Sequence, residues 1–170
     1  MKSKDGRRNG GTRDERATAG ARASRRGLIG ASLVAALGAA GAARAAESDD
    51  KPFAQHRLAL QLSDRAADKQ EFVLSVANKM LTEFGPDRIA IVVVALGPGI
   101  DLLRTSSPNR AMVDSLVSQG VRFDVCMFTV ETVERETKEP VALNPHARRV
   151  VAGVGDLLAL AEGGYTIVRP

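Results

Sequence analysis

Hydrophobic and polar residues follow two periods in turn along residues 57–168. In Arg57–Leu62 a leucine stands at every second position, as in a strand with one buried face. Apolar residues then recur at helical spacing from Phe72 to Phe84, which predicts a helix that begins at Asp68 and buries one stripe. The first two elements are therefore expected to be a strand and a helix.

The limits of this helix and the strand after it also have sequence signals. Asp68 and Glu71 have the spacing of a capping box, and Gly85-Pro86 predicts the end of the helix. Ile89–Leu96 is a continuous apolar run rich in β-branched residues, typical of a parallel strand covered on both faces. Strand, helix and strand in this order predict a right-handed βαβ unit.

The rest of the pattern continues the alternation and predicts a single three-layer α/β domain with a mostly parallel five-stranded sheet. Phe128–Glu136 fits a helix or a strand. We expect Met112, Val113 and Leu116 to be buried in one helix and Leu157, Leu158 and Leu160 to be the apolar residues of another. The other predicted elements are a turn at Gly97–Gly99, a short helix at Ile100–Arg104, a loop at Thr105–Asn109, a helix at Arg110–Gln119, a strand at Val121–Cys126, a loop at Lys138–Arg148, a strand at Arg149–Ala152, a turn at Gly153–Gly155, a helix at Asp156–Glu162 and a strand at Tyr165–Val168.

Charge divides the chain into two parts. Residues 1–45 have ten Lys or Arg and three Asp or Glu, whereas residues 46–170 have 14 and 17, so the basic excess belongs to the first part. An acidic domain with one Tyr and no Trp offers little phosphate neutralisation or base stacking. This composition argues against a nucleic-acid partner.

Residues 1–45 have the order of a secretory signal: a basic region, the uncharged Gly27–Ala43, and the small-x-small pattern Ala43-Arg44-Ala45. Arg25 and Arg26 directly before the apolar stretch resemble a twin-arginine export motif. We predict cleavage between Ala45 and Ala46, a flexible lead-in over residues 46–55, a domain over 56–170, and a periplasmic location. The alternatives are an uncleaved signal that anchors the protein in the membrane, or a disordered basic tail.

In an open parallel sheet, ligands bind where the loops leave the carboxyl ends of the strands. Cys126, the only cysteine, falls at such an end. A helix that starts near Thr129 would stabilise a thiolate there, whereas Glu131, Glu134 and Glu136 would oppose it if they pointed the same way. A packed, inert cysteine is the alternative. The predicted crevice residues are Ser63, Asp64, Gly97, Gly99, Cys126, Thr129 and Gly153.

Other motifs are weaker. Gly97-Pro98-Gly99 matches half of a dinucleotide fingerprint, but Leu102 replaces the third glycine, so we interpret it as a turn. His56 and His146 are interpreted as solvated loop residues, and without a second cysteine or a histidine pair we expect no metal and no cofactor. Arg148-Arg149 is interpreted as part of a surface salt bridge, with an anion site as the alternative.

Four stretches resemble the DsrE/DsrF-like family of small sulfur-relay proteins. The resemblance implies a flavodoxin-like α/β fold, homo-oligomers and, in active members, a cysteine that carries sulfur as a persulfide; Cys126 is the matching position. The stretches are His56–Ser63, Val92–Gly99, Gly120–Cys126 with Thr129, and Val151–Val154 together with the ending Gly164–Pro170.

The leading hypothesis is thus a periplasmic protein whose Cys126 accepts sulfane sulfur from a donor and passes it to an acceptor. A binding or assembly module with a packed cysteine is the alternative, favoured by the bulky Met127 and Phe128 beside it. A disulfide-linked dimer through Cys126 is a third possibility.

Overall fold

The computed structural model describes residue 51 and residues 53–170. The predicted signal, with Arg25, Arg26 and the Ala45–Ala46 cleavage site, lies outside the described residues. Strands and helices alternate in the order β1 (His56–Leu62), α1 (Ala67–Phe84), β2 (Ile89–Ala95), the 3₁₀ helix η1 (Gly97–Leu103), α2 (Arg110–Ser118), β3 (Arg122–Cys126), α3 (Met127–Thr137), β4 (Ala147–Val150), α4 (Gly153–Glu162) and β5 (Thr166–Val168).

The five strands form one parallel sheet in the order β4-β3-β2-β1-β5. This confirms the predicted α/β class with a single five-stranded sheet. After β4 the chain returns across the sheet, so that β5 pairs with β1, with Ala59 opposite Ile167. Flavodoxin itself has the strand order 2-1-3-4-5, so the two sheets share their layers but not their strand order.

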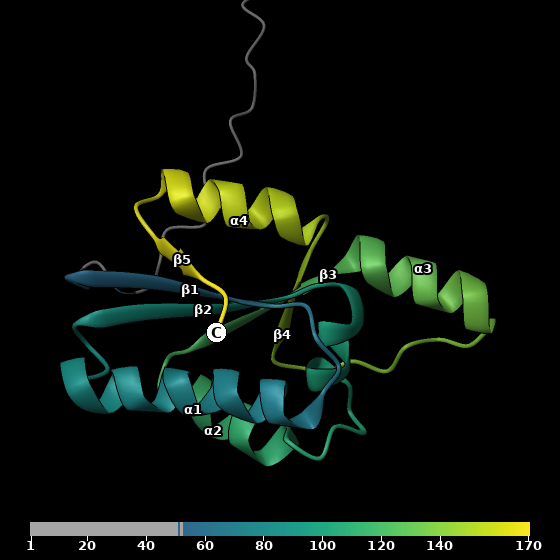
Figure 1. The fold of residues 1–170 in the computed structure, drawn as a ribbon, viewed down its shortest axis with the longest axis horizontal. Helices are drawn as coiled ribbons and strands as arrows, with labels where there is room; N and C mark the ends of the chain where they lie inside the picture. The colour runs from purple at the N-terminus through teal and green to yellow at the C-terminus, as the bar shows by residue number, and fades with distance from the viewer. Residues whose placement is uncertain (1–50, 52) are drawn as a thin grey trace, which may run out of the picture. The chain divides into compact units, whose positions relative to one another are not determined.

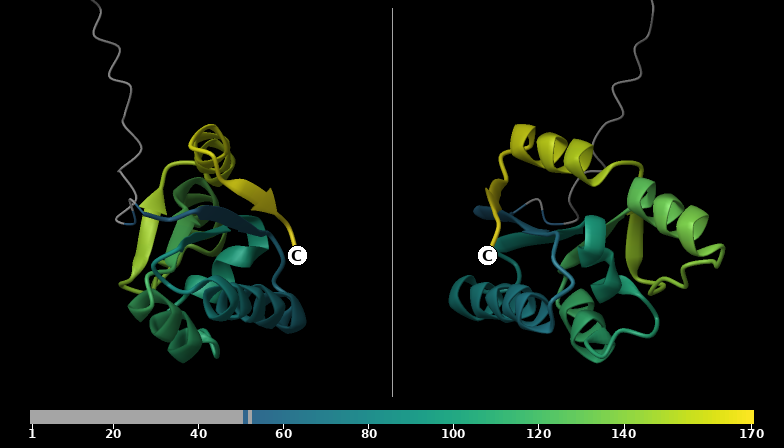
Figure 2. Two further views of the ribbon diagram at one scale, coloured as in Figure 1. Left: turned by 90° about the vertical axis from the view of Figure 1, so that its left-hand side faces the viewer. Right: turned by 45° about the vertical axis from the view of Figure 1, so that its right-hand side comes forward.

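Helices cover the two faces of the sheet unequally. Figures 1 and 2 show α1 and α2 against one face, α4 against the other, and α3 beyond the carboxyl ends of the strands. All seven residues of β2 are buried, and they alternate between two apolar clusters because strand side chains point to opposite faces in turn. Val93 belongs to the larger cluster under α1 and α2, and Val94 to the smaller one under α4.

α1 confirms the long helix predicted from apolar spacing, but its start differs from the capping-box prediction. Ala66 is the N-cap residue, and no side chain caps the helix. Asp68 instead lies in the first turn, where a carboxylate favours the positive end of the helix dipole. Three side chains predicted to be buried are largely exposed, because the buried stripes are narrower than the apolar ones; they are Phe72, Met112 and Leu158.

The largest differences from prediction lie near the end of the chain. β4 spans Ala147–Val150 rather than Arg149–Ala152, which puts Arg148 opposite Asp124 in the sheet. Gly153–Gly155 is the start of α4 rather than a turn, and Gly97–Gly99 is the start of η1. The segment left open between helix and strand is α3.

Before β1, the chain contacts the turn that follows α1. Lys51 Nζ, inside the predicted lead-in, donates a 2.7 Å hydrogen bond to the carbonyl of Pro86. Within the described residues, no helix combines the length and apolar character needed to span a membrane.

Candidate functional site

Cys126 is the last residue of β3 and the N-cap residue of α3. Strand side chains alternate between faces, so Cys126 points to the same face as Asp124, the face covered by α4. Its neighbours in the sheet are the ends of β2 and of β4, where Val150 is its partner in register. The cysteine is 5% exposed, so an incoming reagent needs the surroundings to move before it meets the sulfur.

Two helices begin beside Cys126. α3 starts at Met127, directly after it, and α4 starts at Gly153. A Cβ atom on Gly153 would lie 3.2 Å from Cys126 Cβ and 3.1 Å from Leu96 Cβ, which is tighter than most Cβ contacts, so glycine favours the close approach of α4. Neither helix has a side-chain cap, and the positive ends of both dipoles therefore act on the sulfur.

Thr129 links Cys126 to the end of β2. Its Oγ1 accepts a 3.1 Å hydrogen bond from the backbone N–H of Gly97, whose φ of 52° favours glycine. The proton of the Thr129 hydroxyl is thus available for a hydrogen bond to the Cys126 sulfur. The predicted residues Gly97, Thr129, Gly153 and Cys126 therefore form one cluster.

The surroundings lower the pKa of the Cys126 thiol from its ordinary value. Burial is the largest single influence and raises the pKa, but it is outweighed by the Thr129 hydroxyl and the backbone N–H groups of Gly153, Thr129 and Phe128. Phe128 contributes least, and its N–H also donates to the Val151 carbonyl at 3.1 Å. The site thus stabilises the thiolate relative to that of an ordinary cysteine, despite its burial.

The glutamates of α3 do not cancel this effect. Glu131 and Glu136 are exposed on the helix surface. Glu134 accepts a 2.9 Å hydrogen bond from the backbone N–H of Val141, in the loop that follows α3. The influences on the thiol come from hydroxyl and backbone groups rather than from these carboxylates.

The other predicted crevice residues are not among the groups that act on the pKa of the thiol. Asp64 accepts a 3.1 Å bond from Arg169 near the end of the chain. Gly99 is needed for packing, since a Cβ there would collide with the backbone of Leu62. Ser63 lies beside Gly97, where a Cβ would be 3.9 Å from the Ser63 carbonyl oxygen.

A cluster of charged side chains lies on the same face of the sheet as Cys126. It consists of Asp124 on β3 and Asp156 on α4, with Arg122 and Arg148. Asp124 is fully buried and accepts a 2.8 Å bond from Arg148 Nε. Arg148 therefore forms an ion pair, but with a fully buried aspartate rather than at the surface as predicted. The sequence reasoning missed the two aspartates, although Asp124 interrupts an apolar strand two residues before the cysteine.

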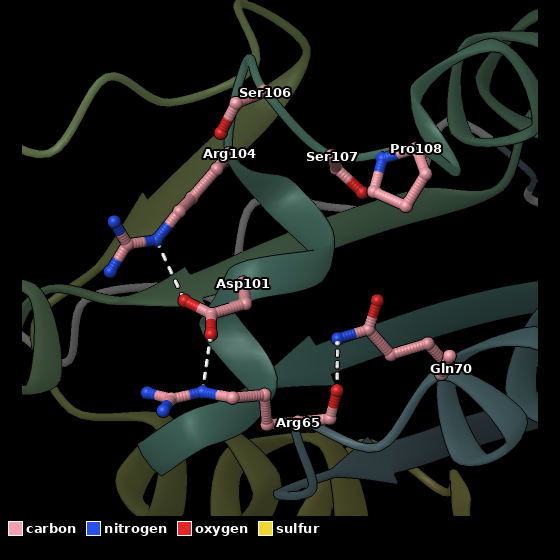
Figure 3. Close-up of a pocket in the computed structure, with 8 residues that line it drawn as sticks. Arg65, Gln70, Asp101, Arg104, Ser106, Ser107 and Pro108 are labelled. Atoms are coloured by element: carbon pink, nitrogen blue, oxygen red, sulfur yellow. Dashed lines mark hydrogen bonds and ion pairs between the residues drawn. The ribbon is translucent and has the colours of Figure 1, made fainter.

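A separate surface hollow of about 510 Å³ lies between α1, η1 and the loop before α2. In Figure 3, Asp101 stands between two arginines: its carboxylate binds Arg65 Nε at 2.6 Å and Arg104 Nε at 2.7 Å. Gln70 donates to the Arg65 carbonyl at 3.2 Å. The Asp101 carboxylate offsets part of the positive charge, and no nucleophilic cysteine lines the hollow, so we place the candidate site at Cys126 instead.

Large apolar side chains are exposed around the start of α3 and along α4. We call them the apolar collar: Phe128 (70% exposed), Val151, Val154 and Leu158. Phe128 and Val151 are joined by the backbone hydrogen bond given above, and Val154 and Leu158 share one face of α4. Among residues 51 and 53–170, no group of three or more His, Cys, Asp or Glu is arranged to hold a metal ion.

Comparison with known proteins shows the fold. No protein-family model matches the chain, and no curated protein sequence matches it. Among solved structures, the chain is similar to MTH1491 of Methanobacterium thermoautotrophicum, a protein of unknown function, with 23% identity and a TM-score of 0.61 over 68% of this chain and 99% of that one. It is also similar to the ychN protein of E. coli, with 11% identity and a TM-score of 0.50 over 67% of this chain and 97% of that one.

Proposed function

We propose that this protein carries sulfane sulfur as a persulfide on Cys126. The observation that carries the proposal is the thiol itself: the polar groups around it lower its pKa although it is buried. The thiolate is the reactive form of cysteine, and these groups favour it before any partner binds. The four stretches that resemble the DsrE/DsrF-like family, with Cys126 at the matching position, support the same chemistry.

The transfer needs no cofactor. The Cys126 thiolate attacks the outer sulfur of a donor persulfide R–S–SH, the S–S bond of the donor breaks, and R–S⁻ leaves with the electron pair. Cys126 then holds –S–SH. An acceptor thiolate attacks this outer sulfur in turn and releases the Cys126 thiolate, so that no net oxidation occurs. Thr129 and the N–H groups of Gly153 and Thr129 would stabilise both anionic forms.

Intact-mass measurement tests the proposal. The purified protein is incubated with a low-molecular-weight persulfide, and we expect a mass gain of one sulfur atom that a reducing thiol removes. Cys126→Ser is the matched control, because the chain has no other cysteine. Absence of the gain, or a gain that persists in Cys126→Ser, contradicts the proposal.

The second candidate is a binding or assembly module with a packed cysteine. The 5% exposure of Cys126 and the exposed apolar collar favour it. Thiol labelling separates the two functions: labelling only after denaturation supports the packed cysteine, whereas labelling of the native protein supports sulfur transfer. A disulfide-linked dimer would appear as a doubled mass on non-reducing electrophoresis.

The setting of this function is also part of the proposal. The secretory pattern of residues 1–45 supports a periplasmic protein, and the apolar collar supports a homo-oligomer. The donor and the acceptor would then be periplasmic persulfides and thiols. An uncleaved signal would provide the only membrane attachment.

A further inference from the structure

The first turn of α4 packs against Cys126. Gly153 lies against the cysteine, while Val154 and Leu158 on the same helix are exposed. The apolar residues that hold α4 to the sheet are Leu157 and Leu160, farther along the helix. In the first turn, the side chain that reaches the sheet is Asp156, through a 3.1 Å bond from Arg148.

Asp156 meets a second carboxylate there. Asp124 already accepts hydrogen bonds from Arg148 Nε at 2.8 Å, Arg148 Nη2 at 3.2 Å and Arg122 Nε at 3.1 Å. Arg148 Nη2 therefore serves both carboxylates. The second oxygen of Asp156, Oδ2, is buried and has no hydrogen-bond partner.

A proton on Asp156 Oδ2 would allow this buried oxygen to form a hydrogen bond. Two carboxylates this close in a buried place do not both ionise readily, and a protonated Oδ2 donates to the Asp124 carboxylate. Burial first, then the charge of Asp124 and a hydrogen bond to it, raise the pKa of Asp156 to about 6, although Arg148 and Arg122 act in the opposite direction. Cys126 is the other titratable group beside the first turn of α4, and Tyr165 packs against Leu157 and Leu160 farther along the helix.

We propose that Asp156 holds a proton on Oδ2 and donates it to Asp124, and that the loss of this proton loosens the first turn of α4 and opens access to Cys126. The proton leaves to solvent, and no redox step is involved. Once both carboxylates are charged, their repulsion acts between β3 and α4, across the contact that holds Gly153 over the sulfur. The regulation of sulfur transfer by this opening rests on the proposed function. The opening itself is a property of the fold and does not depend on that function.

The test measures opening rather than sulfur transfer. The full chain is alkylated with a small neutral thiol reagent from pH 5 to pH 7, around the Asp156 pKa of about 6. Each rate is divided by the thiolate fraction, obtained from the ultraviolet absorbance of the thiolate. In parallel, hydrogen exchange of the α4 amides is followed and corrected for its intrinsic pH dependence.

We expect the corrected alkylation rate and the corrected exchange of the first turn to rise about tenfold together, as one pKa unit of lost interaction would produce. In Asp156→Asn, which cannot lose a proton, the rise should vanish. Asp87→Asn, at an exposed turn residue, is the matched control and should keep it.

A flat corrected rate in the wild-type protein, or an equal rise in Asp156→Asn, overturns the proposal. If Asp156→Asn does not fold, hydrogen exchange of the α4 amides in the wild-type protein is the remaining test. A corrected exchange rate that does not rise between pH 5 and pH 7 also overturns the proposal. A step in exchange without any persulfide on Cys126 would refute the proposed function and leave this inference standing.

Discussion

At the residue scale, the reactivity of Cys126 depends on groups that lie a few ångströms from its sulfur. Thr129 accepts from Gly97 and lowers the pKa of the thiol, so its hydroxyl joins the end of β2 to the sulfur. Gly153 sets the distance between α4 and the sheet. Both contributions can be tested with substitutions that change little else.

Thr129→Val keeps the shape of the side chain and removes the hydroxyl. We expect the pKa of Cys126 to rise and thiol alkylation at neutral pH to slow about fivefold, the factor for about 1 kcal/mol from one hydrogen bond. The alkylation rate as a function of pH measures both. Thr132→Val is the control, because the Thr132 hydroxyl bonds to the Phe128 carbonyl at 2.9 Å instead. Equal alkylation rates in the wild type and Thr129→Val would show that the Thr129 hydroxyl does not act on the Cys126 thiol.

Gly153→Ala tests the close approach of α4. A methyl group there would lie 3.1–3.2 Å from Leu96 and Cys126, so the helix must shift outward. We expect a loss of about 1–2 kcal/mol in the free energy of unfolding, together with faster alkylation of Cys126. Urea unfolding and labelling kinetics measure these effects. Gly155→Ala is the matched control, since its Cβ would be an ordinary 3.9 Å from Ala152.

At this scale the sequence predicted part of the site. Cys126, Thr129, Gly97 and Gly153 were all expected at strand ends, and parallel pairing brings such ends to one edge. Asp64 follows β1 in the same way, but its carboxylate turns to Arg169, a pairing that no local signal reveals. Spacing along the chain identifies the edge of the sheet but does not show which way each side chain turns.

At the scale of elements, α4 is held to the sheet by Leu157 and Leu160 and, in its first turn, by the bond between Asp156 and Arg148. The pKa of Asp156 is raised from 3.8 to about 6 in the folded protein. The protonated carboxyl therefore contributes stability that is complete below pH 3.8 and is lost as the pH rises through 6. This contribution has the opposite sign to that of a carboxylate in a favourable ion pair.

Asp156→Asn should remove that pH dependence. From pH 4 to pH 7 we expect the wild type to lose about 1–2 kcal/mol relative to the variant, after allowance for solvent screening. Urea unfolding at several pH values provides the difference in the free energy of unfolding. A constant difference would mean that Asp156 does not titrate in this range.

Elements with a strong local period were predicted well, and those positioned by distant contacts were not. α1 and β2 are evident from apolar spacing because each buries a regular stripe or run. β4 was misplaced by two residues because Arg148 must stand opposite Asp124, and this register is a tertiary property. Gly153 and Gly155 indicated a turn, but packing against Leu96 and Cys126 favours a helix that starts at once.

At the scale of the whole molecule, the apolar collar is the surface suited to self-association. Val154→Lys with Leu158→Lys places two charges on the exposed face of α4. We expect this double variant to sediment as a monomer if copies meet there, while its secondary structure is unchanged. Ser75→Lys is the control, because it adds a charge to the exposed face of α1, where Lys79 already lies. Sedimentation that is the same for all three proteins would remove the collar as an interface.

Export is also tested on the whole chain. We expect replacement of Arg25 and Arg26 by Lys to leave the precursor in the cytoplasm, because the twin-arginine route requires the pair. Arg7 and Arg8 form a second arginine pair that is not directly before the apolar stretch, so the same replacement there is the control. Fractionation of cells shows both outcomes, and unchanged export of the Arg25/Arg26 variant would exclude this route.

The pairing of β5 with β1 determines when the sheet closes. Leu58 lies opposite Thr166, so one edge of β1 stays unpaired until the chain has been synthesised past Val168. The first strand of the sheet therefore waits for its last strand while every element between them is made. During that interval the open edge of β1 can pair with another chain, and the arrival of β5 removes this route to aggregation.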